Sequence, residues 1–162
     1  MPLHTSSNHD GQLTNQKGIH AFWESQLPEL FGDTYNLCTG PAKYIDNVEK
    51  ETWRIIFQSH SLVDTLLLAE KNTGLAFGAG EIYQKDEKGS VRKTKYNQWI
   101  HSKEYATRYH EALKGMVERQ IRLAIAATAN FWYTAWVDAG KPDLTSLDDS
   151  DLTTQNKNRF NE

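Results

Sequence analysis

Two histidines and a glutamate near the N-terminus have the residue types and the spacing of a metal site. His20 and Glu24 are four residues apart in a segment with helical apolar spacing, so both side chains leave the same face of a helix. His4 precedes them in a loop. Two imidazoles and a carboxylate form a common ligand set for a catalytic zinc ion, which keeps a further position for water. A His and a Glu at this spacing also form ordinary side-chain pairs, so spacing alone leaves both interpretations open.

The other chemically active residues form no motif of a known catalytic class. The chain contains no P-loop, GxGxxG, GxSxG, CxxC or HExxH pattern. Cys38, the one cysteine, lies in a loop-like stretch where packing is its usual role, and a single cysteine excludes a disulfide within the chain. His9 and Asp10 lie in the loop after His4, where they either support the metal ligands from behind or form a solvated turn.

Helical periodicity describes most of the chain beyond this loop. Apolar residues at spacings of three and four predict helices over residues 19–31, 46–71 and 102–139. Pro28 is expected to kink or shorten the first helix, and Gly115 is expected to bend or break the last one. The fold class that follows is all-α.

The segments between and after the helices have the composition of surface loops. Residues 74–96 combine glycines with many charges and predict a surface excursion with at most a short strand or hairpin. Short Val and Ile runs alternating with helices, which α/β folds need, are absent from the sequence. Residues 145–162 are rich in Asp, Asn, Thr and Gln and predict a disordered tail.

Length and composition limit the chain to one domain of moderate acidity. The chain has 162 residues and a formal net charge of −3, which provides no overall attraction to nucleic acid or to an anionic membrane. The longest uncharged run, Leu123–Val137, has fifteen residues. A membrane-spanning helix needs roughly 20 residues, so no transmembrane segment is expected. The first ten residues lack the basic and apolar regions of a signal peptide, and localisation stays open.

The residues around His4 and His20 carry a wider pattern. Pro2-Leu3-His4 is followed by a loop and by the segment Gly18-Ile19-His20-Ala21-Phe22-Trp23-Glu24-Ser25. This arrangement resembles the zinc-dependent phospholipase C and S1/P1 nuclease superfamily, in which His-x-Pro-Leu-His precedes His-x-x-Trp-Asp or His-x-x-Trp-Glu at the start of a helix. The stretch from Phe131 to Gly140 is similar to a bacterial subgroup of the same family. The resemblance covers residues 2 to about 144.

The resemblance implies a helical bundle that hydrolyses phosphodiester bonds with zinc. His4, His20 and Glu24 would bind one zinc ion of a three-zinc cluster. Among the residues around this site, Asn8 and Ser25 are candidates to line the substrate cleft, and Asp10 and Trp23 are candidates to support the ligands from behind. The substrate would be nucleic acid or a phospholipid, and the sequence does not distinguish the two. Members of the family are usually secreted or periplasmic.

One departure from the family pattern changes the expected activity. Family members carry an N-terminal Trp and further Asp and His ligands before the Pro-Leu-His segment, whereas here Met1 stands where that motif would still be running. Residues 1–144 therefore resemble the C-terminal part of a single zinc-hydrolase domain, truncated at the N-terminus, with ligands for one of three zinc sites. We expect weak or no hydrolysis by the chain alone, and self-association through exposed apolar stripes.

A different class of function also agrees with these features. The chain could be a non-catalytic helical interaction module, or a remnant, that retains the family scaffold. Stoichiometric zinc with phosphodiesterase turnover would support the enzyme. Zinc-independent folding together with a stable complex would support the interaction module.

Overall fold

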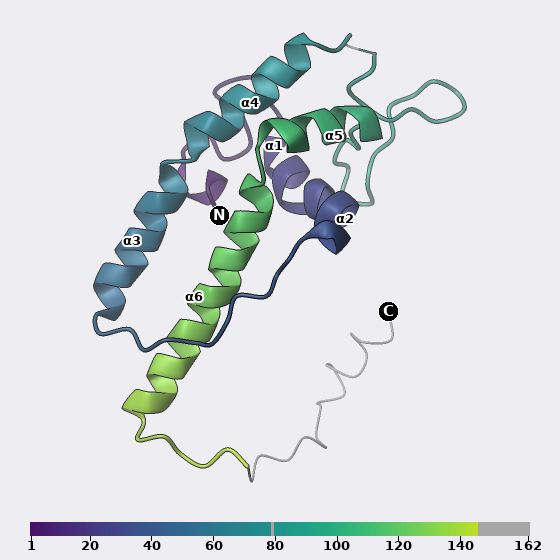
Figure 1. The fold of residues 1–162 in the computed structure, drawn as a ribbon. Coiled ribbons are helices and arrows are strands. Elements are labelled where there is room, and N and C mark those ends of the chain that lie inside the picture. Colours follow the sequence, from purple (N-terminus) through teal and green to yellow (C-terminus); the bar gives the residue numbers. More distant parts are fainter. Residues whose placement is uncertain (79, 146–162) are drawn as a thin grey trace.

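The computed structural model describes residues 1–78 and 80–145, and every regular element within them is a helix (Figure 1). The predicted all-α class is therefore confirmed for this part of the chain. The predicted tail begins at residue 145, and residues 146–162 lie outside the described part. In chain order the helices are η1 (Leu3–Thr5), α1 (Ile19–Ala21), η2 (Phe22–Gln26), α2 (Leu27–Phe31), η3 (Gly32–Thr34), α3 (Val48–His60), α4 (Val63–Leu75), α5 (Lys103–Ala112) and α6 (Met116–Asp138).

The first predicted helix is continuous, but its middle turn is widened. In η2 the N–H of Leu27 bonds to the carbonyl of Phe22, five residues earlier, which is the pattern of a π-turn. Pro28 follows directly, and a proline ring collides with the carbonyl of the residue four positions earlier, here Glu24. The wider turn makes room for the ring. The helix therefore continues past Pro28 to Phe31, where the sequence predicted a kink or a shortening.

The prediction of a single helix over residues 46–71 is wrong, because the structure has two helices there. α3 ends at His60, and α4 begins at Val63 and extends to Leu75. The Ser61 hydroxyl donates to the Gln58 carbonyl at 2.8 Å, and this local bond competes with the helical pattern. Asn47 caps α3 by accepting a hydrogen bond from the backbone N–H of Lys50 at 2.8 Å.

A pair of short hairpins links α4 to α5 and folds back over η2. Isolated antiparallel bridges join Tyr83 to His101, Lys85 to Val91 and Lys93 to Trp99. The predicted excursion over residues 74–96 is thus present with different bounds, because α4 continues to Leu75 and the last bridge lies at His101. It also contains two hairpins, where at most one was expected. The hairpins are anchored by Gln26 on η2, whose amide donates to the Trp99 carbonyl at 2.7 Å and accepts from the His101 N–H at 3.0 Å.

The break expected at Gly115 is confirmed and separates α5 from α6. Lys114 and Gly115 both have left-handed backbone angles, with φ of 49° and 75°. A left-handed residue ends a helix, and glycine adopts this conformation without the steric cost that a side chain adds. The reversal turns α6 away from α5 and lets it extend beyond the core (Figure 1).

The hydrophobic core lies at the end of the molecule where η2, α4 and α5 meet. Its fourteen buried residues come from η1, the α1–α2 helix, α4, α5 and the first turn of α6. The largest fully buried side chains include Trp23, Phe22, Tyr105 and Tyr109. Nine core residues lie next to the metal-ligand candidates in sequence or pack against the helix that carries them: Leu3, Ile19, Phe22, Trp23, Leu27, Leu66, Leu67, Tyr105 and Tyr109. The core therefore holds the N-terminal loop and the α1–α2 helix together.

The opposite end of the molecule exposes apolar surface. α3 and most of α6 extend side by side away from the core (Figure 1), with a cavity of about 220 Å³ lined by residues of both. Trp53 and Phe57 on α3 are 51% and 66% exposed, and Trp132 on α6 is 76% exposed. Among the described residues, we find no helix with both the length and the apolar character needed to cross a bilayer.

Candidate metal centre

Three side-chain atoms converge on one point near the N-terminus. The Nε2 atom of His20 lies 3.0 Å from Oε2 of Glu24, and Nε2 of His4 lies 3.1 Å from the same oxygen. The two Nε2 atoms are 3.1 Å apart. These residues form the one group of three or more metal-ligating side chains found in the described part of the chain. A tetrahedral zinc ion with ligands at about 2.0–2.1 Å spaces neighbouring ligand atoms roughly 3.3 Å apart, close to this triangle.

The triangle of atoms fits a cation better than it fits a set of hydrogen bonds. Each neutral imidazole carries one proton, and a carboxylate only accepts, so at most two of the three short contacts can be hydrogen bonds at once. The second carboxylate oxygen of Glu24, Oε1, is buried and has no hydrogen-bond partner in the described structure. A buried carboxylate oxygen without a partner is costly unless a cation compensates it.

Two short local structures bring His4 to the other ligands. Leu3, fully buried in η1, fixes the position of His4 beside the helix. Gly18 enters α1 with a left-handed φ of 86°, and its N–H donates to the Asp10 carboxylate at 3.2 Å. The loop therefore closes on itself and delivers His20 to the first turn of α1, four residues before Glu24. The π-turn of η2 then carries Glu24 into the cluster.

The cluster is open on the side of His4 and closed on the side of Glu24. The side chains of His4, His20 and Glu24 are 57%, 30% and 14% exposed, respectively. A metal ion held by these atoms would therefore keep contact with solvent, which a catalytic site needs for its water and its substrate.

A cavity of about 400 Å³ adjoins the cluster at His20. Its wall includes His9 and Lys17 from the N-terminal loop and Trp99 from the hairpins. The ring of His9 lies edge-on to that of His20, with 5.8 Å between centroids. A cation, an aromatic side chain and a second histidine thus lie beside His20 in this cavity. No local sequence pattern connects Lys17 or Trp99 with His20, so only the folded structure shows that they lie near it.

The remaining predicted site residues take varied positions. Asn8 is buried, and its amide group donates to Thr14 Oγ1 at 3.0 Å and accepts from the Leu13 N–H at 2.8 Å, so it stabilises the loop. Ser25 is exposed on η2. Trp23 packs in the core behind Glu24, and its indole Nε1 is buried without a partner in the described structure.

Asp10 and His60 support the centre through the backbone. The Asp10 carboxylate accepts a hydrogen bond from the Gly18 N–H, so it supports the cluster indirectly, through the loop that precedes His20. His60 is exposed at the end of α3, and its Nδ1 atom lies 3.1 Å from the Thr5 carbonyl. Since His4 and Thr5 share η1, this contact places the end of α3 against the segment that carries the first ligand.

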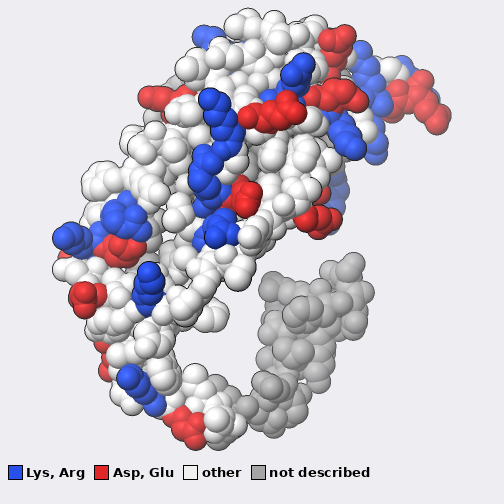
Figure 2. Space-filling model, in the orientation of Figure 1, with Lys and Arg blue, Asp and Glu red and all other residues white. Residues whose placement is uncertain are grey.

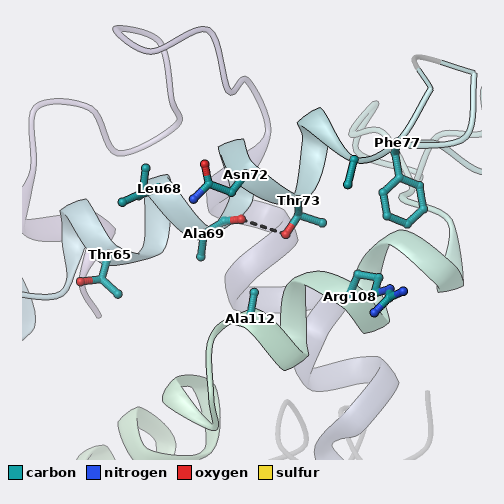
Figure 3. Close-up of a pocket in the computed structure, with 9 residues that line it drawn as sticks. Thr65, Leu68, Ala69, Asn72, Thr73, Phe77, Arg108 and Ala112 are labelled. Carbon is teal, nitrogen blue, oxygen red and sulfur yellow. Dashed lines mark hydrogen bonds between the residues drawn. The ribbon is translucent and has the colours of Figure 1, made fainter.

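Two other features of the surface lie outside the metal centre. A larger cavity of about 750 Å³ between α4 and α5 is lined mainly by apolar and neutral side chains such as Leu68, Ala69 and Phe77, with Arg108 at its edge (Figure 3). It contains none of the three cluster residues. Lys and Arg are mixed with Asp and Glu on the face shown in Figure 2, so this face presents no broad surface of one charge.

Comparison of the chain with protein-family models, with curated proteins and with solved structures finds no match. The functional interpretation therefore depends on the residues of the site and their geometry.

Proposed function

We propose that the protein is a zinc-dependent hydrolase of phosphodiester bonds, of the phospholipase C or S1/P1 nuclease type, whose zinc ligands in this chain are His4, His20 and Glu24. The observation that carries the proposal is the triangle of Nε2, Nε2 and Oε2 atoms, with all three sides between 3.0 and 3.1 Å. The local pattern His20-x-x-Trp23-Glu24 after Pro2-Leu3-His4 supports the choice of family.

The chain's own residues have separable roles in this proposal. The two imidazoles and the carboxylate hold the ion, and zinc, when bound, supplies Lewis acidity and a water of lowered pKa. Trp23 fills the core behind Glu24 and keeps solvent from that side.

The test is zinc content, because it does not depend on finding the natural substrate. We expect about one zinc ion per chain by elemental analysis, and a loss of most of it in the His20→Ala, Glu24→Ala double variant. The matched control is His9→Ala, which removes a neighbouring histidine that lies outside the triangle of ligands. Zinc at the wild-type level in the double variant, or none in the wild-type chain, would contradict the ligand assignment.

Turnover is the second measurement. A chromogenic diester, bis(p-nitrophenyl) phosphate, should be hydrolysed slowly by the zinc-loaded chain, and chelation should abolish the reaction until zinc is restored. One zinc site out of the three in the family limits the expected rate, because the other ions would share the charge on the phosphoryl oxygens. Full zinc occupancy without hydrolysis of any diester would favour the second candidate.

The second candidate is a non-catalytic helical interaction module. The exposed aromatic residues of α3 and α6, among them Trp53, Phe57 and Trp132, favour it. Solvent-exposed apolar surface of this kind commonly marks an interface. A fold that melts at the same temperature with and without zinc, together with a stable complex, would support this function over the first.

A further inference from the structure

A second cavity, of about 650 Å³, lies between the N-terminal loop, α4, the hairpins and α5. Five of its lining residues are aromatic: Phe22, Tyr83, Trp99, His101 and Tyr105. Tyr83 and Trp99 meet at an angle of 62° with 5.0 Å between ring centroids, and they form a corner of the wall. The volume lies in the range of small-molecule sites. Trp99 is exposed and Tyr83 is partly exposed, whereas Phe22 and Tyr105 are fully buried.

One carboxylate, that of Glu70 on α4, lies among these rings. Its Oε1 atom accepts from the Tyr105 hydroxyl at 2.6 Å, and its Oε2 atom accepts from the Gln16 amide at 2.6 Å. Both donors are neutral, and among the described residues no basic group forms an ion pair with Glu70. A carboxylate has about four acceptor positions, so each oxygen retains capacity for a further partner.

The negative charge of Glu70 acts on the wall of the cavity. Burial and then the charge of Glu70 raise the pKa of Tyr83, and the same charge contributes to the raised pKa of Tyr105. Both phenols are uncharged at physiological pH, as ordinary tyrosines are. Of the two, only Tyr83 is partly exposed, because Tyr105 is fully buried. The carboxylate of Glu70 would repel an anion inside the cavity. The faces of aromatic rings carry partial negative charge, so the aromatic residues of the wall would repel an anion as well.

Aromatic faces with one carboxylate select organic cations. The face of an aromatic ring attracts an ammonium group, and recognition of quaternary ammonium groups by aromatic cages is the best-known case. A metal ion would need several oxygen or nitrogen ligands, and the described residues contain no second group of three metal-ligating side chains. Lys17 and Lys71 also line the cavity, but both are exposed, so their charges are screened by water and salt.

We propose that this cavity binds a small organic ammonium compound, with its cationic group against Glu70 and the faces of Tyr83 and Trp99. The site does not depend on zinc. It shares Lys17 and Trp99 with the smaller cavity beside His20, so the two cavities adjoin.

The experiment is an NMR titration of the full chain with tetramethylammonium chloride in the presence of a chelator. The neutral comparison is tert-butanol, which has a similar shape and no charge, and sodium chloride keeps the ionic strength constant. We expect saturable shifts of the His101 and Tyr105 backbone amides with tetramethylammonium, and about tenfold weaker binding of the alcohol. Tetramethylammonium has no N–H, so its binding reports charge and π contacts alone.

Two variants locate the site. Glu70→Gln keeps the shape and an acceptor oxygen, and it should weaken tetramethylammonium binding about tenfold while leaving the alcohol unchanged. Asp64→Asn is the matched control, because it removes a carboxylate six residues earlier on α4, about 9 Å away along the helix. Trp99→Leu keeps apolar volume without a π face and should also weaken binding.

Three results would overturn the proposal. The first is equal affinity for tetramethylammonium and tert-butanol in the wild-type chain. The second is tighter binding of acetate than of tetramethylammonium at the same amides. The third is an absence of saturable shifts at these amides. The wild-type comparison stands without any variant, so a failure of Glu70→Gln to fold does not remove the test.

Discussion

At the scale of single residues, His101 shows how burial selects one protonation state. Its Nδ1 atom lies 3.1 Å from Oε1 of Gln26, which only accepts, so Nδ1 carries the proton and Nε2 does not. The ring stacks on Phe22 with 3.6 Å between centroids. Burial lowers the pKa of His101 from 6.5 to about 4. The folded protein therefore keeps this imidazole neutral at a pH where an exposed histidine would be charged.

The neutral state of His101 predicts a loss of stability in acid. Between pH 6.5 and about 4 the unfolded chain binds a proton that the folded protein excludes, so the free energy of unfolding falls as the pH falls. The full change from this residue is roughly 3 kcal/mol. Above pH 6.5 the residue contributes no pH dependence, and below about 4 it adds no further loss. Urea unfolding at several pH values across this range, with a chelator present, measures how steeply the free energy of unfolding depends on pH.

Two substitutions separate His101 from the other histidines. His101→Gln should remove this part of the slope, because no titratable group remains at the buried position. His9→Gln is the control, because it replaces an exposed histidine outside the core. An identical slope in the wild-type chain and in His101→Gln would show that burial of this ring does not produce the acid sensitivity.

At the scale of elements, the break between α5 and α6 depends on one backbone conformation. Gly115 has a φ of 75°, and a Cβ atom added there would lie 3.2 Å from a guanidinium nitrogen of Arg119. A hydrogen bond from the N–H of Met116 to the Leu113 carbonyl, at 3.0 Å, closes a tight turn around Gly115. The chain changes direction within this turn. The direction of α6 relative to the core is set by this turn.

Gly115→Ala should therefore destabilise the fold. A left-handed conformation costs an L-residue about 1–2 kcal/mol, and the contact with Arg119 adds to this cost. A loss of this size lowers the melting temperature by roughly 2–8 °C for a chain of this length. Gly32→Ala is the control, because Gly32 has a φ of −56° and no atom near its added Cβ. Equal melting temperatures for the two variants would contradict the explanation.

At the scale of the whole molecule, the distribution of apolar surface is uneven. The core gathers at one end, whereas α3 and the distal part of α6 expose large side chains at the other. A helix that is apolar on several faces is normally covered on several faces, and the uncharged run Leu123–Val137 lies within α6. This end of the molecule is therefore where we expect association.

We expect the chain to self-associate through this surface. Sedimentation velocity should show an average sedimentation coefficient that rises with protein concentration. Trp132→Glu should weaken the association at least about tenfold, because it places a charge in the apolar surface. Tyr96→Glu is the control, since Tyr96 on the hairpins is 72% exposed, close to the 76% of Trp132. A single monomeric species at every concentration would contradict this expectation.

The local features of the fold were largely predictable from sequence. The positions of the helical segments, the break at Gly115 and the hairpin segment all depend on periodicity or on a residue's own backbone preference, which neighbours along the chain report. Errors appeared where local patterns compete. The predicted helix over residues 46–71 is interrupted near Ser61 and forms two helices. The helix that contains Pro28 continues past it, because the π-turn before Pro28 makes room for the proline ring.

Which residues could bind a metal follows from the sequence alone, because ligand chemistry is a property of residue type and His20 and Glu24 share a helix. The folded structure was needed to show that His4 reaches them, since its contact depends on how the intervening loop packs. The same holds for Glu70 among the aromatic rings and for how much of the apolar stripe of α3 is exposed. Periodicity shows which face of a helix is apolar, whereas burial depends on whether another part of the molecule covers that face.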